Sequence, residues 1–155
     1  TEIFATDVHP QMLAAARIRC RAFSEISIQQ ADALALPYKD ASFDAVLLSL
    51  ALHHFEGADQ LRVLREMARV SRNIMVVNDL ARTRLNYLGS RLLQMTAWRH
   101  NRLTSHDGPL SVLRSFTVHE LEDLAARAGL RGKVRRHFFQ RIVLVVTNST
   151  AVPFS

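Results

Sequence analysis

Glycine clusters, cysteine pairs and long apolar runs are all missing from this sequence of 155 residues. Its single cysteine, Cys20, excludes an internal disulfide, which agrees with a reducing compartment. No apolar run reaches the roughly 18 residues of a membrane span, and the first residues, TEIFATDVHP, lack the charged and then apolar pattern of a signal peptide. These absences predict a soluble protein of the cytoplasm.

The five glycines stand apart from one another, at positions 57, 89, 108, 129 and 132. None of them belongs to a G-x-G cluster, the kind of loop that lets a backbone approach a nucleotide cofactor and present its N–H groups to it. The sequence therefore lacks the most common signal of a nucleotide-binding turn.

Charge is distributed unevenly along the chain. Residues 1–80 hold 8 Lys and Arg against 10 Asp and Glu, whereas residues 81–155 hold 12 against 4. A basic half is compatible with nucleic acid, an acidic lipid surface or an anionic substrate, and equally with a solvated arginine-rich surface. The hydrophobic content of 48% is sufficient for one globular domain over residues 1–155.

Strand and helix patterns alternate along the chain. Residues 43–50 form a nearly continuous apolar run, typical of a parallel strand covered on both faces. Thr117 and Glu120 match a capping box, which predicts where the last helix begins. We expect strands at 2–6, 26–30, 43–50, 73–77, 133–139 and 141–146, and helices at 10–21, 58–71, 82–103 and 117–128.

This alternation predicts an α/β fold with a largely parallel sheet, in which the last two strands pair antiparallel. Parallel sheets bind ligands at the carboxyl ends of their strands. Asp7, Asp32 and His53 each lie just beyond a predicted strand. We therefore expect these three polar residues along one edge of the sheet.

Several segments, taken in order, resemble the class I S-adenosylmethionine-dependent methyltransferases, especially the branch that acts on small molecules. The segments are FATDVHPQMLAAARIR, QQADALALPYKDASFDAVLLSLALHHF, LREMARV, IMVVNDL and FTVHELEDLAARAGL. The resemblance covers nearly the whole chain. It implies a Rossmann-like methyltransferase sheet, mostly parallel, with a C-terminal antiparallel hairpin, and S-adenosylmethionine as the cofactor.

The resemblance also implies roles for individual residues. Asp7 matches the acidic residue that holds the ribose hydroxyls, since a carboxylate accepts two hydrogen bonds from a diol. Asp32 matches the residue that receives the adenine amino group. The other implied cofactor contacts are Val8 and Met12 on the adenine, the Ala33 and Leu34 backbone along the ring edge, and Ser49 and Leu50 near the methionine part. Asp7 read alone is also compatible with a helix cap, and Asp32 with an ordinary turn carboxylate.

The sequence departs from this family at its beginning, because it contains neither the first strand nor the glycine-rich loop that follows it. That strand would lie in the middle of the sheet, between the strands ending at Thr6 and Leu50. Its absence leaves two edges without partners, which favours association. A fragment of a longer protein, a partner chain or a rearranged strand would each account for it. We expect the chain as given to bind S-adenosylmethionine weakly or not at all, so that it could be inactive in this form, and to self-associate as a homo-oligomer through its open sheet edges.

The paired histidines His53 and His54 follow the strand at residues 43–50. Methyl transfer from a sulfonium mainly requires alignment and exclusion of water, so a base is optional. An imidazole could take the proton of a hydroxyl or an acidic carbon at neutral pH. We therefore name His53 and His54 as candidate catalytic residues, against the alternatives of a contact to the methionine carboxylate or a helix cap. Adjacent histidines without a third ligand predict no metal site.

The acceptor is expected to be a small or lipid-like molecule. The segment SLALHH replaces the Asp/Asn-Pro-Pro-aromatic turn of amino-directed nucleic-acid enzymes, and Cys20 lies too far from the strand ends for a base-carbon nucleophile, so a nucleic-acid partner is not expected. Residues 82–115 would form a substrate cover, or alternatively a core helix with a basic face. Two other functions remain open: a nicotinamide-dependent oxidoreductase, and a non-catalytic methyltransferase-like subunit that binds a partner.

Overall fold

The computed structural model describes residues 1–82, 115–137 and 140–147. These residues form six strands and four helical segments, joined by loops. The strands are β1 (Ile3–Asp7), β2 (Ile26–Gln30), β3 (Phe43–Ser49), β4 (Ser71–Leu80), β5 (Gly132–His137) and β6 (Arg141–Thr147). The helices are α1 (Pro10–Cys20), η1 (a 3-10 turn, Leu52–His54), α2 (Ala58–Val70) and α5 (Val118–Arg127). The helix expected at 82–103 and nearly all of the expected substrate cover lie outside the described residues.

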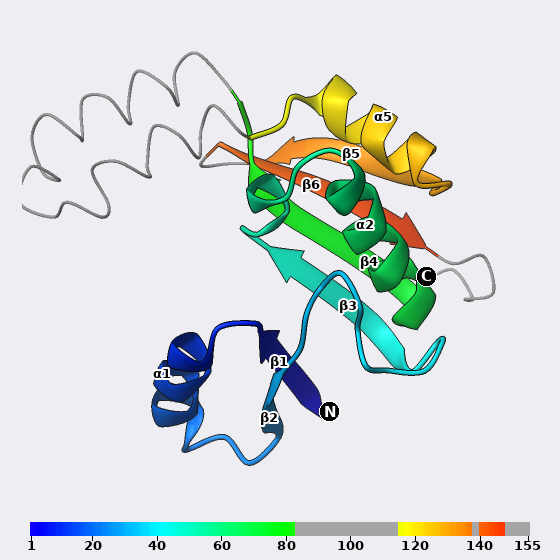
Figure 1. The fold of residues 1–155 in the computed structure, drawn as a ribbon. Coiled ribbons are helices and arrows are strands. Elements are labelled where there is room, and N and C mark those ends of the chain that lie inside the picture. The colour runs from blue at the N-terminus through cyan, green and yellow to red at the C-terminus, as the bar shows by residue number, and fades with distance from the viewer. Residues whose placement is uncertain (83–114, 138–139, 148–155) are drawn as a thin grey trace, which may run out of the picture.

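The strands form two groups (Figure 1). β1 and β2 pair in parallel, and the other four form a sheet in the order β3-β4-β6-β5. Within this sheet β3 and β4 are parallel, whereas β6 is antiparallel to both β4 and β5. The predicted α/β fold and its C-terminal antiparallel hairpin are therefore confirmed.

β1 and β3 are the strands that face each other across the boundary between the two groups, and their arrows point the same way in Figure 1. Among the described residues, no strand pairs with β1 on its β3 side or with β3 on its β1 side. Phe4 and Phe43 make an edge-to-face contact across this boundary, with ring centroids 5.4 Å apart, and Tyr38 packs on Phe43 at 4.8 Å. In the described residues, the position between β1 and β3 is therefore left without a strand.

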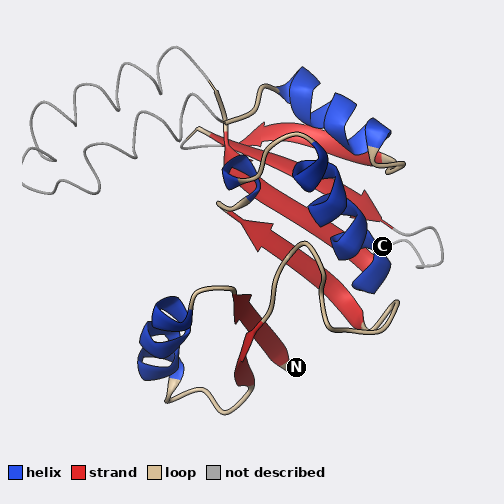
Figure 2. Ribbon diagram, viewed as in Figure 1, coloured by secondary structure: helices blue, strands red, loops and turns tan. Residues whose placement is uncertain are grey.

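The core lies between the four-stranded sheet and the helices α2 and α5, which cover the same face of that sheet (Figure 2). Alternate residues of the strands point into it, because successive side chains of a strand face opposite sides. On α2 the buried positions recur at helical spacing, as the sequence predicted. The core side chains include Val63, Leu64, Met67, Met75, Val77, Leu121, Leu124, Ile142, Leu144 and Val146.

Helix α1 forms where the sequence predicts a helix but buries few of its side chains. Leu13 is its buried residue, while Met12 and Ile18 are 57% and 69% exposed. The helix contacts β1 and β2, but it buries one side chain, whereas α2 buries four. The helix expected at 10–21 is therefore present, with much of its apolar surface left exposed by the described residues.

Helix α5 begins where the sequence predicted. The Thr117 side chain accepts a hydrogen bond from the Glu120 backbone N–H, and the Glu120 side chain accepts one from the Thr117 N–H. This reciprocal pair is the capping box. The helix ends before Gly129, whose φ of +83° lies in the left-handed region that glycine adopts without strain.

Gly132 gives a test of how tightly the hairpin packs. A Cβ at this position would lie 2.6 Å from Leu144 Cδ1 and 2.7 Å from the carbonyl oxygen of Val145. We expect Gly132→Ala to lower the free energy of unfolding by about 1–3 kcal/mol, the usual cost of overpacking. Urea unfolding followed by circular dichroism measures it.

The matched control is Lys133→Ala, since Lys133 is exposed on the same strand. Its effect should stay within about 0.5 kcal/mol, as is usual for surface substitutions. Equal stabilities of the two variants would mean that β5 and β6 separate enough to admit the methyl group.

Candidate functional site

The polar residues predicted for the site lie at the carboxyl ends of the parallel strands. Asp7 ends β1 and pairs in register with Gln30, so Asp32 follows just beyond the end of the neighbouring strand β2. Ser49 ends β3, where its register partner on β4 is Asn78. β1, β2, β3 and β4 run in one direction (Figure 1), and these ends consequently share one edge of the fold.

Asp7 is half-buried in the turn between β1 and α1. Its Oδ1 accepts a hydrogen bond from the His9 backbone N–H at 2.8 Å. No described residue bonds to Oδ2, so the carboxylate keeps an oxygen that can accept a further hydrogen bond. Val8 and Met12 beside it are 49% and 57% exposed, which leaves apolar surface next to the carboxylate.

Asp32 lies in the turn after β2. Its Oδ1 accepts a hydrogen bond from the Leu34 backbone N–H at 2.9 Å, and its backbone forms a bridge with Ala35. Ala33 and Leu34 are half-buried and pack against the main core. The turn is therefore attached to the core by apolar side chains while its carboxylate stays exposed.

Arg69 on α2 holds the chain that follows this turn. Its guanidinium donates to the carbonyl oxygens of Leu36 and Tyr38, at 2.9 and 2.7 Å, and to the carboxylates of Glu66 and Asp40. Glu66 in turn accepts the Leu36 N–H at 2.9 Å. This network could not be predicted from the sequence, because α2 and the segment that it holds are about 30 positions apart in the chain.

The charges of this network stabilise one another. The hydrogen bond from Arg69 lowers the pKa of Glu66, and burial opposes that shift only in part. The hydrogen bonds to Glu66 and Asp40 raise the pKa of Arg69 above its ordinary value. The loop that carries Asp32 is therefore held by an ion pair. Its acidic member, Glu66, stays ionised at pH values lower than those at which a glutamate side chain usually takes up a proton.

At the end of β3, Ser49 and Leu50 are tied to β4. The Ser49 hydroxyl accepts a hydrogen bond from Asn78 Nδ2 at 3.1 Å, and the Leu50 N–H donates to the Asn78 carbonyl oxygen at 2.8 Å. Leu50 has a φ of +56°, which ends the strand one residue earlier than the apolar pattern predicted. Both residues are exposed at the edge.

The two histidines occupy different environments. His53 is 4% exposed, whereas His54 is exposed, and their rings lie 4.1 Å apart between centroids. His53 Nδ1 lies 2.6 Å from Oδ1 of Asp79, a residue at the carboxyl end of β4 that is fully buried. Asp79 was not named from the sequence. The sequence did contain a signal that could have identified it: IMVVNDL, like the segment that ends at Asp7, is an apolar strand closed by an acidic residue.

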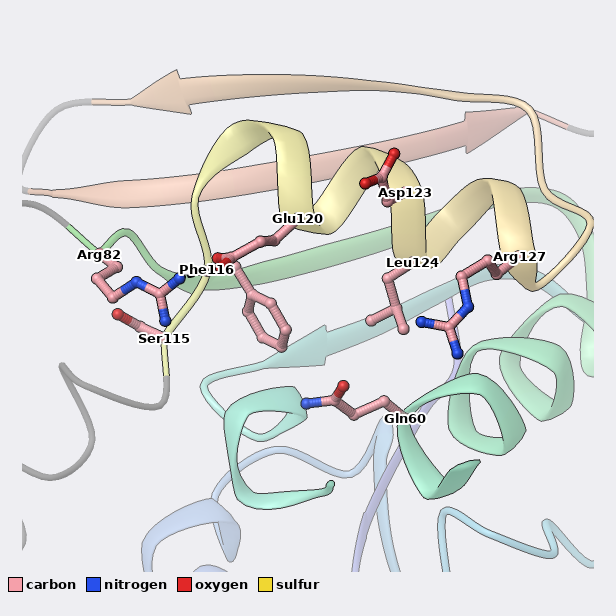
Figure 3. A pocket seen from close by; sticks show the side chains of 8 residues that line it. All are labelled: Gln60, Arg82, Ser115, Phe116, Glu120, Asp123, Leu124 and Arg127. Carbon is pink, nitrogen blue, oxygen red and sulfur yellow. Dashed lines mark hydrogen bonds and ion pairs between the residues drawn. The ribbon is translucent and has the colours of Figure 1, made fainter. Parts of the chain in front are cut away.

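A hollow of about 340 Å³ lies between the start of α2 and α5 (Figure 3). Arg82 and Glu120 form an ion pair at one end of it, and Arg127 lies at the other. The chain leaves and re-enters the described fold here, because Arg82 N–H donates to the Phe116 carbonyl oxygen and Phe116 N–H to that of Leu80. Arg82 and Ser115, the described residues on either side of this gap, therefore lie near the carboxyl end of β4, next to the site edge.

No group of three or more His, Cys, Asp or Glu suited to a metal ion is found in the described parts of the chain. No helix in these same parts has both the length and the apolar content needed to cross a membrane.

Comparison with known proteins shows the fold and a family similarity over the first half of the chain. Residues 1–73 match the family model described as a methyltransferase domain. A demethylmenaquinone methyltransferase of Thermus thermophilus is 41% identical over 70 residues, and one of Deinococcus radiodurans is 46% identical over 70 residues. Each match covers 44% of this chain, but only 31% and 28% of the relative, so the chain matches about a third of the length of these proteins.

Among solved structures, a SAM dependent methyltransferase from Aquifex aeolicus superposes with a TM-score of 0.70. It is 14% identical, and the match covers 94% of this chain and 68% of that one. At such low identity the likeness shows the fold alone.

The described residues therefore have the fold of the class I S-adenosylmethionine-dependent methyltransferases. The first 73 residues match the methyltransferase domain family model, and this match agrees with the resemblance recognised in the sequence. Family and fold together imply S-adenosylmethionine as the cofactor.

The residues present fit one part of this cofactor. Asp7 and Asp32 each keep a carboxylate oxygen without a partner among the described residues, as binding of hydroxyl or amino groups requires. Val8 and Met12 offer exposed apolar surface for an adenine ring. On the side between β1 and β3, the described residues supply no strand or loop against the methionine part.

The ion pair on α2 predicts a pH dependence of stability. Because the folded pKa of Glu66 is lowered from 4.5, its contribution is complete above the unfolded pKa and is lost as the pH falls through the folded value. We expect Glu66→Gln to flatten the decline in the free energy of unfolding below about pH 4.5. Urea unfolding at a series of pH values measures this.

Arg69→Met should flatten the same decline in the free energy of unfolding at acid pH, since the hydrogen bond from Arg69 is the largest cause of the lowered pKa of Glu66. It should also speed hydrogen exchange at the Leu36 N–H, whose acceptor is Glu66. If the free energy of unfolding of both variants declined at acid pH as steeply as that of the wild type, other carboxylates would determine the decline.

Proposed function

We propose that this chain binds S-adenosylmethionine through Asp7 and Asp32 and belongs to an enzyme that transfers its methyl group to a small, lipid-like acceptor. The observation that carries the proposal is the placement of the two carboxylates at the carboxyl ends of adjacent parallel strands, each with an open oxygen. Such an edge is where open α/β sheets bind their ligands. The relatives named demethylmenaquinone methyltransferase support the acceptor class.

The proposed division of roles follows the geometry. The open oxygen of Asp7 accepts the ribose hydroxyls, and that of Asp32 accepts the adenine amino group. Val8 and Met12 pack against the ring, with the Ala33 and Leu34 backbone along its edge. Ser49 and Leu50 lie toward the methionine part. The bound cofactor supplies an activated methyl group, so the protein has mainly to orient the acceptor and exclude water.

The segment 82–115 is proposed as the acceptor's cover. Both of its ends are fixed beside the carboxyl end of β4, where the site edge passes. We further propose a cytoplasmic location and no nucleic-acid partner, supported by the single cysteine and by the absence of the proline turn after β3.

Cofactor binding tests the proposal directly. We expect Asp7→Asn and Asp32→Asn each to weaken S-adenosylmethionine binding about tenfold or more, the usual scale for a hydrogen bond to a charged group. Binding by the 155-residue chain itself should be weak, because one side of the edge is open. Isothermal calorimetry provides the dissociation constants.

Asp44→Asn is the matched control, because Asp44 lies at the opposite end of β3 and pairs with Arg72. It should change the affinity less than twofold. Preference for a nicotinamide dinucleotide over S-adenosylmethionine would contradict the proposal and favour an oxidoreductase.

A second candidate function is that of a methyltransferase-like subunit that binds a partner. It is favoured by the exposed apolar surface along the boundary of β1 and β3, where Ile3 is 47% and Leu47 67% exposed. Strand edges with exposed apolar residues promote association. Under this function the chain would bind no cofactor and would co-purify with a partner of its own.

The same surface leads us to propose self-association of the 155-residue chain. We expect its mass to rise with concentration in the micromolar range, and Leu47→Lys to reduce this, because a charge on an exposed edge opposes strand pairing. Sedimentation velocity measures it. Lys39→Ala, on an exposed turn, is the control and should not change the association. A monomer at all concentrations would contradict the proposal.

A further inference from the structure

The contacts between His53 and Asp79 distinguish two histidines that the sequence left equivalent. Asp79 accepts two backbone hydrogen bonds, from the His53 N–H to Oδ2 at 3.2 Å and from the Leu80 N–H to Oδ1 at 2.7 Å, and its Oδ1 also lies 2.6 Å from His53 Nδ1. Both of its oxygens are therefore acceptors. Donors converge in this way on an ionised carboxylate, which has no proton to give.

An ionised acceptor determines the tautomer of its partner. Since Asp79 can only accept, Nδ1 of His53 carries the proton, and in the neutral ring Nε2 is then left with a lone pair. No hydrogen bond from a described residue reaches Nε2. An unpaired side-chain nitrogen or oxygen that is fully buried occurs in the described residues only at Arg141 Nη1. Because Nε2 of His53 is unpaired but is not such an atom, it keeps some access to solvent.

The position of this nitrogen links it to the site. His53 lies in η1, which is separated from the end of β3 by two residues and packs on β4, so the ring is close to the carboxyl ends of both strands. Its exposed fraction is 4%. A largely buried imidazole with one fixed nitrogen and one open nitrogen is the arrangement in which a carboxylate orients a general base.

We propose that Asp79 is the positioning residue that holds His53 with Nε2 open, and that His53, not His54, takes the proton of the methyl acceptor. This inference rests on the proposed methyltransferase function. It restricts the acceptor to molecules with an ionisable O–H or an acidic C–H, because an uncharged amine needs no base before it attacks.

The step balances without a further reactant. Nε2 takes the proton of the acceptor, whose freed electron pair forms the bond to the methyl carbon. The bond between that carbon and the cofactor sulfur breaks, and its electrons stay on sulfur. The sulfonium becomes a neutral thioether, and the proton passes from the imidazolium of His53 to solvent after the methylated product forms.

The tautomer can be measured without any substrate. In ¹⁵N-labelled protein, two-bond correlations from the ring hydrogens should show a protonated Nδ1 and an unprotonated Nε2 for His53 in the neutral ring. In Asp79→Asn the amide can donate to Nδ1, so the proton should move to Nε2. Wild-type protein with the proton on Nε2 would overturn the proposal.

The kinetic arm uses reduced demethylmenaquinone as the probe acceptor and radiolabelled S-adenosylmethionine as the donor. His53→Gln and Asp79→Asn should each lower kcat about 100-fold or more, the scale of general-base catalysis, with KM changed less than threefold. His54→Gln is the matched control and should stay within threefold. The double variant should be no slower than His53→Gln alone, because the two residues act as one unit.

Other outcomes separate the inference from the proposed function. If the wild type binds S-adenosylmethionine by calorimetry, but His54→Gln loses activity and His53→Gln keeps it, the inference is overturned while the proposed function stands. Failure of the wild type to bind the cofactor overturns the proposed function, and the inference with it. Thermal unfolding of each variant shows whether it is folded. If Asp79→Asn does not fold, His53→Gln still tests the proposal.

Discussion

The parallel pairing of β3 with β4 is the contact on which the candidate site depends. It places Ser49 opposite Asn78, so that a side-chain and a backbone hydrogen bond join the two strand ends at the site edge. It also brings η1, which follows β3, beside the last residues of β4, where Asp79 receives His53. The carboxyl ends of neighbouring parallel strands lie at the same edge of a sheet. His53 and Asp79, which are 26 positions apart in the chain, therefore come into contact there.

A second set of contacts attaches the cofactor-side turn to this sheet. Arg69 on α2 donates to two backbone carbonyls of the segment after Asp32, and Glu66 accepts one of its N–H groups. Backbone groups in a loop need partners as much as those in a strand do, and here a helix supplies them. The packing of α2 on the sheet thus determines the position of Asp32 as well as that of the core.

Most strands, α2 and α5 could be predicted from the sequence, because each rests on local patterns: apolar runs, helical spacing and the Thr117 capping box. The edge residues Asp7, Asp32 and Ser49 could be placed because strand ends share an edge in a parallel sheet. The Arg69 network and the choice between His53 and His54 could not. They depend on which distant residues become neighbours, and nothing local marks Asp79 as the partner of His53. The exposure of Met12 and Ile18 on α1 could not be predicted either, since a helical pattern does not tell how much of a helix its neighbours will cover.

Asp79 occupies a place where an apolar residue would be expected. Met75 and Val77, which precede it on the same face of β4, are buried in the core, and Asp79 is as fully buried as they are. Burying a carboxylate is costly even when it is paired, and an apolar residue of similar size often gives equal or greater stability at such positions. Stability alone therefore does not account for it. An exception of this kind to the local pattern is most often found at a functional site, and here it lies beside the edge at which the proposed chemistry takes place.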